Sequence, residues 1–333
     1  MKKIICLYIV ASSFLSGLAH AETSTPVKVN DVITASNAFI NSLDKEQQSM
    51  VIVDYTQANA VKWTNLPCGL ACRVGIMFGS LSPGQLTLAK AVAKAALGAK
   101  PGTGYDQYIG IMEADADLGK NREGYSSNNY IIAFLGRPSA SGKWQLQLGG
   151  HHLAINLSFN GGKVTGASPN FMGLEPPENN TLKANHNAMI AMLNALNSEQ
   201  LAKAKLQEGF ADVLVGPGKD GKFPATKSGL QASSLNKAQK VLIVAAMRNW
   251  VQIADNETAA SILGTYSKQL DDTYISYFGN RELNSKGDYV RIDGPGVWIE
   301  FICQPGAVYP QGIHYHTVYR DHLKDYGGNF EFK

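Results

Sequence analysis

The amino-acid sequence predicts an α+β fold, in which an antiparallel sheet of central and C-terminal strands carries N-terminal helices and an inserted helical segment. Two patterns support this prediction. Apolar and polar residues alternate at 143–162 and again within the last sixty residues, as they do in strands with one buried face. Between these stretches the apolar residues recur at helical spacing. We therefore expect one α+β domain over residues 22–333, with the helical insertion at about 181–277.

The first 21 residues, MKKIICLYIVASSFLSGLAHA, have the features of a secretory signal peptide: two lysines, an apolar run and a small-residue cleavage site. The run is too short and too rich in serine to span a membrane, and no later stretch is apolar enough to do so. We expect cleavage after Ala21 and a periplasmic or secreted protein. Loss of Lys2 and Lys3 lowers the formal charge from +3 to +1, so no basic surface for nucleic acid is expected.

The N-terminal part of the predicted domain is helical. Residues 30–50 carry apolar side chains at loose helical spacing. A second helix begins with SPGQ at residues 82–85 and runs to about residue 97, because serine favours the cap, proline the first turn and glutamine the third position after the cap. A third helix is predicted at Tyr105–Leu118.

The central strands are predicted from alternation and from glycine. Tyr130–Leu135 is an apolar strand, and KWQLQLGGHHLAINLSFNGG at 143–162 holds two more. Gly149-Gly150 and Asn160-Gly161-Gly162 are predicted hairpin turns, because glycine adopts the positive φ that tight hairpins require. Residues 169–177, PNFMGLEPP, are predicted to be a proline-bounded loop that leaves the sheet.

The inserted segment is predicted to contain four helices, which begin near Leu182, at Ser198, at Val241 and at Thr258. Its glycine- and lysine-rich stretch, Val215–Ser228, lacks the setting of a phosphate-binding loop, and we expect an exposed loop there. The last predicted strands are Asp288–Ile292, VWIEFICQ at 297–304 and IHYHTVYRD at 313–321.

Four of the seven histidines stand in two pairs, His151-His152 and His314-x-His316. His314 and His316 share one face of a strand, about 7 Å apart at the backbone, where two imidazoles can bind one ion. His151 and His152 are adjacent and point to opposite faces of a regular strand. His152 shares its face with small and polar residues, so we predict that it joins His314 and His316, and that His151 is buried or donates a hydrogen bond that supports a ligand. A bulge would instead bring His151 to the ion.

Imidazole suits several divalent transition metals, so zinc, copper and iron are all candidates. Glu300 is a candidate fourth ligand or general base, and Glu175 competes for this role. Arg320 shares the face of His314 and His316 and is a candidate for positioning an anion. The alternative without a metal is that the histidines form part of a hydrogen-bonded surface.

Two functions are consistent with such a site. One is a metal-dependent hydrolase or oxidoreductase that acts on a small or cell-envelope molecule. The other is a non-catalytic periplasmic protein that binds a metal or a small ligand. An open coordination position beside a carboxylate would favour the enzyme, and a closed four-ligand site would favour the binding protein. The sequence leaves the oligomeric state open.

Three cysteines follow the predicted cleavage site. Cys68 and Cys72 are expected to form a small disulfide in an oxidising compartment, with Cα atoms less than about 7 Å apart. Cys303 is expected to be free and buried in a strand. A thiolate metal or redox site is the weaker alternative, because the C-x3-C spacing is not that of redox motifs.

Several long motifs carry a family resemblance: RVGIMFGSLSPGQLTLAKAVAKAALG, WQLQLGGHHLAINLSF, PNFMGLEP, RIDGPGVWIEF and HYHTVYRDH followed by DYGG. Together they resemble a family of secreted bacterial proteins classed as a domain of unknown function, number 3500 in its series. The resemblance runs from about Trp63 to Gly328. It implies a single-domain exported protein, and it implies no reaction, substrate or catalytic residue. Cys68 and Cys72 lie outside the shared pattern, which favours a local stabilising disulfide over a part of the family's shared site.

Overall fold

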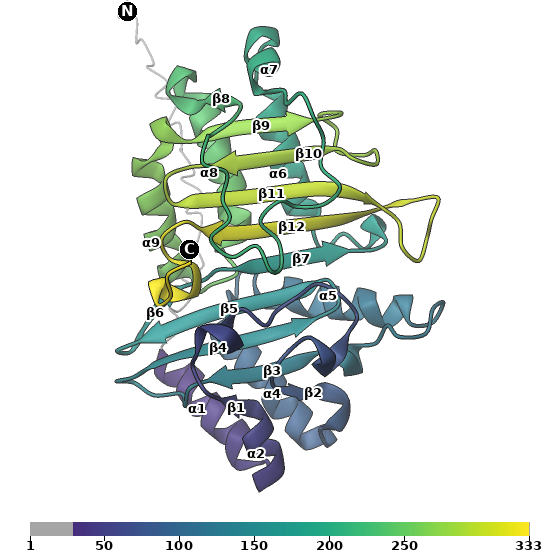
Figure 1. Cartoon of the computed structure of the whole chain (residues 1–333), viewed down its shortest axis with the longest axis vertical. Coiled ribbons are helices and arrows are strands. Elements are labelled where there is room, and N and C mark those ends of the chain that lie inside the picture. Colours follow the sequence, from purple (N-terminus) through teal and green to yellow (C-terminus); the bar gives the residue numbers. More distant parts are fainter. Residues whose placement is uncertain (1–28, 333) are drawn as a thin grey trace, which may run out of the picture.

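The computed structural model describes residues 29–332, so the predicted signal peptide lies outside the described residues. The described chain has a mixed α+β fold built on one large open sheet, as the sequence predicts (Figure 1). The strands are β1 (Ile52–Val53), β2 (Ile76–Met77), β3 (Ile131–Leu135), β4 (Lys143–Gly150), β5 (Leu153–Asn160), β6 (Lys163–Gly166), β7 (Asn170–Leu174), β8 (Leu230–Gln231), β9 (Tyr274–Phe278), β10 (Tyr289–Asp293), β11 (Val297–Pro305) and β12 (Ile313–Asp321).

The strand order is β1-β3-β4-β5-β7-β12-β11-β10-β9-β8, with β2 beside β3 and β6 beside β5. Each pair of neighbouring strands is antiparallel except β1 and β3. The C-terminal hairpin β11–β12 therefore lies in the same sheet as the central hairpin β4–β5, as predicted. Strand β7 is the element between them.

The α-helices of the described chain are α1 (Val29–Asn41), α2 (Lys45–Val51), α3 (Gln57–Ala60), α4 (Pro83–Ala96), α5 (Tyr105–Leu118), α6 (Lys183–Asn194), α7 (Ser198–Ala204), α8 (Lys237–Val251) and α9 (Asn256–Lys268). The capping box predicted for α4 is present, because Ser82 and Gln85 exchange backbone and side-chain hydrogen bonds. The helix predicted at 30–50 is two helices, since Asp44 starts α2 with a second capping box. No described helix has the length and apolar character needed to cross a bilayer.

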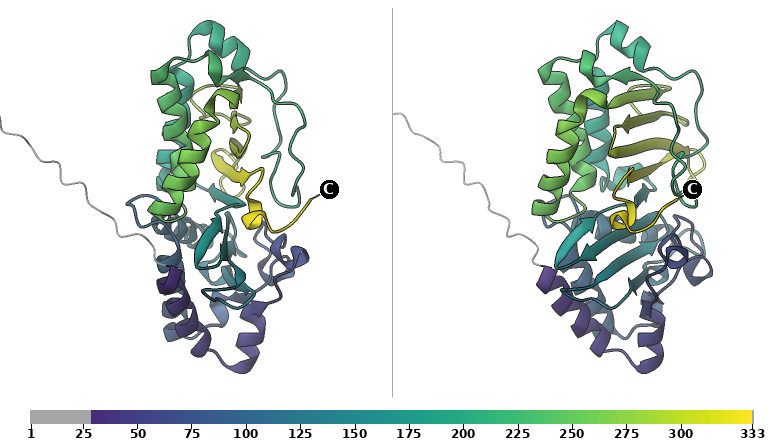
Figure 2. Two further views of the ribbon diagram at one scale, coloured as in Figure 1. Left: turned by 90° about the vertical axis from the view of Figure 1, so that its left-hand side faces the viewer. Right: turned by 60° about the vertical axis from the view of Figure 1, so that its left-hand side comes forward.

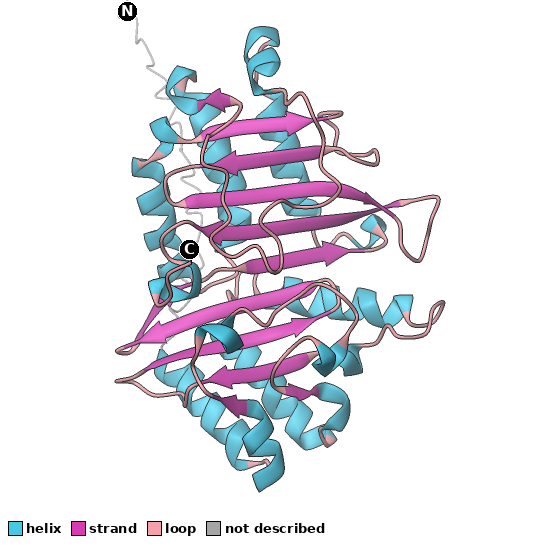
Figure 3. Ribbon diagram, in the orientation of Figure 1, coloured by secondary structure: helices cyan, strands magenta, loops and turns pink. Residues whose placement is uncertain are grey.

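The two faces of the sheet are covered differently, as the side views of Figure 2 show. The long helices pack on one face, which we call the helical face. Ile299, Phe301 and Cys303 of β11 belong to the core on this face. Irregular segments cross the other, the loop face, where they cover Trp298 and Ile302 (Figure 3). This alternation along β11 is the one predicted from the sequence.

The sheet consists of two halves. Strands β1–β6 form the N-terminal half-sheet and β7–β12 the C-terminal half-sheet. They are joined by β5 and β7, which pair only over Leu153–Ile155 and Asn170–Met172. Beyond this short joint β5 pairs with β6 instead, so the two halves diverge (Figure 1).

One sequence prediction was wrong in this part of the chain. Residues 169–177 are not a loop: their prolines lie at the ends, and Asn170–Leu174 forms the buried strand β7. The inserted segment at 181–277 contains α6, α7, α8 and α9, as predicted, and it also contains β8 and most of β9. The stretch 215–228 is a loop, as predicted, but Val215 at its start is buried on the loop face.

The cysteine predictions are confirmed. Cys68 and Cys72 form a disulfide with Cα atoms 5.9 Å apart, and Cys303 is free and buried. Arg73, which follows the disulfide, donates hydrogen bonds of 2.7 Å to the carbonyls of Thr64, Leu66 and Gly150. The disulfide segment is thereby tied to the end of β4.

Candidate metal centre

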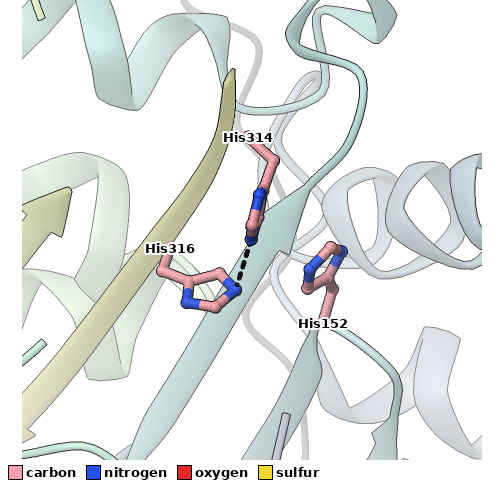
Figure 4. Close-up of side chains that lie close together, drawn as sticks. All are labelled: His152, His314 and His316. Atoms are coloured by element: carbon pink, nitrogen blue, oxygen red, sulfur yellow. Dashed lines mark hydrogen bonds between the residues drawn. The ribbon is translucent and has the colours of Figure 1, made fainter. Parts of the chain in front are cut away.

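His152, His314 and His316 converge on the loop face, as Figure 4 shows. One ring nitrogen from each can be chosen so that all three lie within 4.8 Å of one another. The Nε2 atoms of His314 and His316 are 3.0 Å apart. Two nitrogens bound tetrahedrally to one zinc ion are about 3.3 Å apart, so this pair already has the spacing of ligands, and the third ring needs only a small shift. All three residues are at most 7% exposed.

The adjacent histidines form the turn of the central hairpin. Gly150 pairs with Leu153, so His151 and His152 are the two turn residues, and Gly149-Gly150 ends strand β4. The predicted glycine turn is therefore wrong, and so is the inference that the two rings point to opposite faces. Their ring centroids are 3.7 Å apart and the rings stack.

The backbone of His152 has φ = 58°, a left-handed conformation that is uncommon for a residue other than glycine. Two backbone hydrogen bonds hold it there. Its amide donates to the carbonyl of Asn65 at 3.0 Å, and its carbonyl accepts from the amide of Gly173 at 2.7 Å. Such a conformation outside glycine often marks a functional site.

Gly173 makes the meeting of the rings possible. It is paired with His316 on one side and hydrogen-bonded to His152 on the other, so the three residues form a row across the strands. Two strand spacings separate the outer residues by about 9.5 Å, and the imidazoles bridge this gap above a residue without a side chain. A Cβ atom at Gly173 would lie 2.7 Å from Cδ2 of His152.

We therefore expect Gly173→Ala to displace the ring of His152. The variant should bind metal at least tenfold more weakly, as substitutions beside metal ligands do, and should lose about 1–3 kcal/mol of stability through overpacking. Metal titration and urea unfolding measure the two effects. Gly84→Ala is the matched control, because a Cβ atom there meets nothing within 4 Å. Equal metal affinity in both variants would contradict the role of Gly173.

Carboxylates orient two of the four histidines. Nδ1 of His316 is 2.9 Å from Oδ1 of the half-exposed Asp212, which leaves Nε2 directed at His314. Nδ1 of His151 is 2.5 Å from Oδ1 of the buried Asp115, on α5. A carboxylate on the far nitrogen fixes the tautomer and the orientation of a metal-binding histidine. His316 has this arrangement directly, whereas His151 supports the site by stacking on His152.

Burial keeps two of the candidate ligands, His152 and His314, in the neutral form that binds metal. Burial, and then the neighbouring His151 and His316, lower the pKa of His152 well below its usual range. Burial and His316 lower the pKa of His314 to about 3. Burial is the largest single influence on the pKa of Asp212 and raises it, but the hydrogen bonds from His316 and from the amide of Val213, with the electrostatic effect of the two histidines, together lower the pKa below its usual value.

The lowered pKa of His314 predicts a pH dependence of stability. Below pH 6.5 the unfolded chain binds a proton at His314 that the folded protein excludes until about pH 3. Stability of the metal-free protein should therefore fall as the pH falls through this window, by at most about 1.4 kcal/mol per pH unit from this residue. Urea unfolding at pH 7, 6 and 5 measures the slope. We expect His314→Gln to have a shallower slope, and an unchanged slope would contradict the prediction.

Glu300 shares the loop face with the histidines but is not grouped with them. It is fully buried, and its carboxylate accepts from the amides of Leu214 and Val215 and from Nε1 of Trp298. Burial raises its pKa to about 7, against these hydrogen bonds. Glu300 thus anchors the long loop and lies outside the histidine group, and its role as ligand or general base stays a prediction.

The other two candidates also have structural partners. Oε1 of Glu175, which follows β7, accepts from the amides of Val308 and Tyr309, at 2.9 and 2.8 Å. Arg320 is fully buried and forms ion pairs with Asp220 and Asp325, at 2.7 and 2.6 Å. Its guanidinium is held by these partners, and the anion-positioning role stays a prediction.

Three contributing residues were missed in the sequence. Asp115 carried a signal, since it occupies an apolar position of α5 together with Ile111 and Leu118. Gly173 carried a weaker one, as a glycine inside a short apolar run. Asp212 lies in an irregular segment, and no local pattern links it to His316.

A family model described as "Protein of unknown function (DUF3500)" matches residues 25–328. No curated protein and no solved structure matches the chain.

Proposed function

The chain belongs to the DUF3500 family of proteins of unknown function, and from that premise we propose that it is a metal-dependent enzyme whose centre is formed by His152, His314 and His316. The observation that carries this proposal is the convergence of three buried imidazoles from two distant parts of the sequence. Three imidazoles fit a divalent transition metal, and zinc, copper and iron all accept them.

The number of ligands favours an enzyme over a closed structural site. Among the described residues, no Asp, Glu or Cys belongs to the group of three histidines. Three protein ligands leave a coordination position open, which is typical of catalytic sites. A metal in such a site supplies a Lewis acid and lowers the pKa of a water molecule in the open position.

The protein residues would hold this centre rigidly. Asp212 keeps Nε2 of His316 directed inward, and the backbone bonds of His152 keep its ring over Gly173. Hydrolysis of a small or cell-envelope substrate is the reaction class that we propose, and oxidation is the second. Export to the periplasm or beyond is part of the same proposal and rests on the N-terminal sequence alone.

One observation favours a non-catalytic metal-binding protein instead. Each of the three histidines is at most 7% exposed, so a substrate would need a movement of the covering loops to reach their rings. The half-exposed Asp212 lies in one of these loops. Its displacement would uncover His316.

Elemental analysis of the protein, purified without metal-chelating resin, tests the proposal first. We expect about one equivalent of a transition metal. Hydrolysis of p-nitrophenyl acetate and bis(p-nitrophenyl) phosphate, measured before and after chelation and reloading, then separates the functions. Metal-dependent turnover supports the enzyme, and stoichiometric metal without turnover or oxidase activity supports the binding protein. Protein that neither contains nor takes up a stoichiometric metal would refute both.

A further inference from the structure

A cleft of about 680 Å³ lies on the helical face where the two half-sheets diverge. Strand β6 and helix α9 line it, together with the end of β12 at Tyr319 and Asp321. Its volume is within the range of small-molecule sites. Tyr319 lies on the face of β12 opposite His316, and nearer the other end of the strand, so the cleft is separate from the metal centre.

The innermost part of the cleft is a directed hydrogen-bond chain. Oη of Tyr266 donates to Oδ2 of Asp321 at 2.6 Å and lies 2.8 Å from Oη of Tyr319. Because the only hydroxyl proton of Tyr266 is engaged, Tyr319 must donate to Tyr266. Oδ1 of Asp321 accepts from the amides of Leu323 and Lys324, both at 2.9 Å. The hydroxyl and carboxylate oxygens of these three residues can still accept hydrogen bonds, but they have no proton left to donate. A ligand that binds here must therefore supply hydrogen-bond donors.

The walls of the cleft are rich in hydroxyl groups. Thr258, Ser261 and Thr265 line it from successive turns of α9, and Thr165 lines it from β6. Ser168 is fully buried in the lining, and its Oγ has no hydrogen-bond partner among the described residues. A buried hydroxyl without a partner is costly. An incoming polar ligand would satisfy it.

The charges around the cleft nearly cancel. Asp255, Glu257 and Asp321 carry negative charge, and Lys163 and Lys324 carry positive charge at exposed positions. Such a balance gives neither a cation nor an anion a strong advantage. We propose that the cleft binds a small, neutral polyhydroxylated ligand, of the chemical class of a mono- or disaccharide. Its hydroxyl groups would donate to Asp321 and Tyr319 and to the wall hydroxyls of Thr165, Thr258 and Thr265, whose own protons are donated within the protein.

Calorimetry and saturation-transfer NMR on the mature protein test this proposal, with glucose, N-acetylglucosamine and maltose as probes and spermidine as the cationic comparison. Ser261→Trp fills the cleft from the solvent side of α9. Ser267→Trp is the matched control, because Ser267 is exposed on the same helix and does not line the cleft. Urea unfolding establishes that both variants are folded.

We expect saturable binding of at least one sugar. Ser261→Trp should weaken it at least tenfold, and Ser267→Trp should change it less than twofold. Metal content should be the same in both variants, so the outcome is independent of the function proposed for the histidines. The proposal is overturned if none of the three sugars saturates the protein at millimolar concentration. It is also overturned if Ser261→Trp binds as well as the control, or if spermidine is the probe that occupies the cleft.

Discussion

Replacement of His316 by alanine is expected to reduce the bound metal from about one equivalent to none. His316 contributes Nε2, which lies 3.0 Å from Nε2 of His314. Its Nδ1 is hydrogen-bonded to the carboxylate of Asp212, which orients the ring. Two remaining imidazoles hold a divalent ion poorly, since such sites use three or four protein ligands. The fold should persist, because Val318 and Ile302 beside it keep their packing on the loop face.

The measurement is metal content after dialysis, together with circular dichroism. His322→Ala is the matched control, because His322 contacts Phe223 and Asp293 and is outside the group of three. We expect the control to retain its metal. Unchanged metal content in His316→Ala would refute the metal centre, whereas loss of metal in both variants would indicate a general loss of structure.

Replacement of Arg320 by methionine is expected to have the largest effect on stability, a loss of about 3–5 kcal/mol. The substitution leaves the buried carboxylates of Asp220 and Asp325 without their cation, and removal of one partner of a buried pair is strongly destabilising. Urea unfolding measures it. The exposed Arg137→Met is the control and should change stability by less than about 0.5 kcal/mol.

A triple variant identifies the cause. Combining Arg320→Met with Asp220→Asn and Asp325→Asn removes the charges together, so much of the lost stability should return. Folded Arg320→Met protein should also keep its metal, because Arg320 has no bond to the histidines. A variant as stable as the control would show that the ion pairs of Arg320 contribute little to stability. That result would favour the predicted anion-positioning role of Arg320.

The sequence was most informative where side-chain alternation is fixed by the backbone. The faces of β11 and the shared face of His314 and His316 follow from a period of two residues, which every regular strand obeys. The start of α4 followed from a local capping box. These features depend on residues a few positions apart, so one sequence suffices to predict them.

Features that depend on tertiary contacts were missed. Two glycines favoured a turn at Gly149-Gly150, but the register with β5 and the hydrogen bonds to Asn65 and Gly173 place the turn two residues later, at the histidines. Glu300 was correctly placed on the less apolar face. Its partners, Leu214 and Val215, come from a remote loop that no periodicity predicts.

The short joint between β5 and β7 also determines when the metal centre can form. His152 belongs to one half-sheet and His316 to the other, and about 160 residues of chain separate them. Contacts so distant in sequence close late in folding, after the local hairpins and helices. The three imidazoles therefore come together only once both halves have formed and met.

Metal uptake would be the last event of maturation. The bound ion would then stabilise the pairing of β5 with β7. At a thousand times its dissociation constant a bound ion adds about 4 kcal/mol to stability. That free energy would be concentrated beside the three residue pairs by which β5 and β7 join the two half-sheets. Loss of the ion would first loosen the β5–β7 pairing, and amide hydrogen exchange at Leu153–Ile155 would report it before either half unfolds.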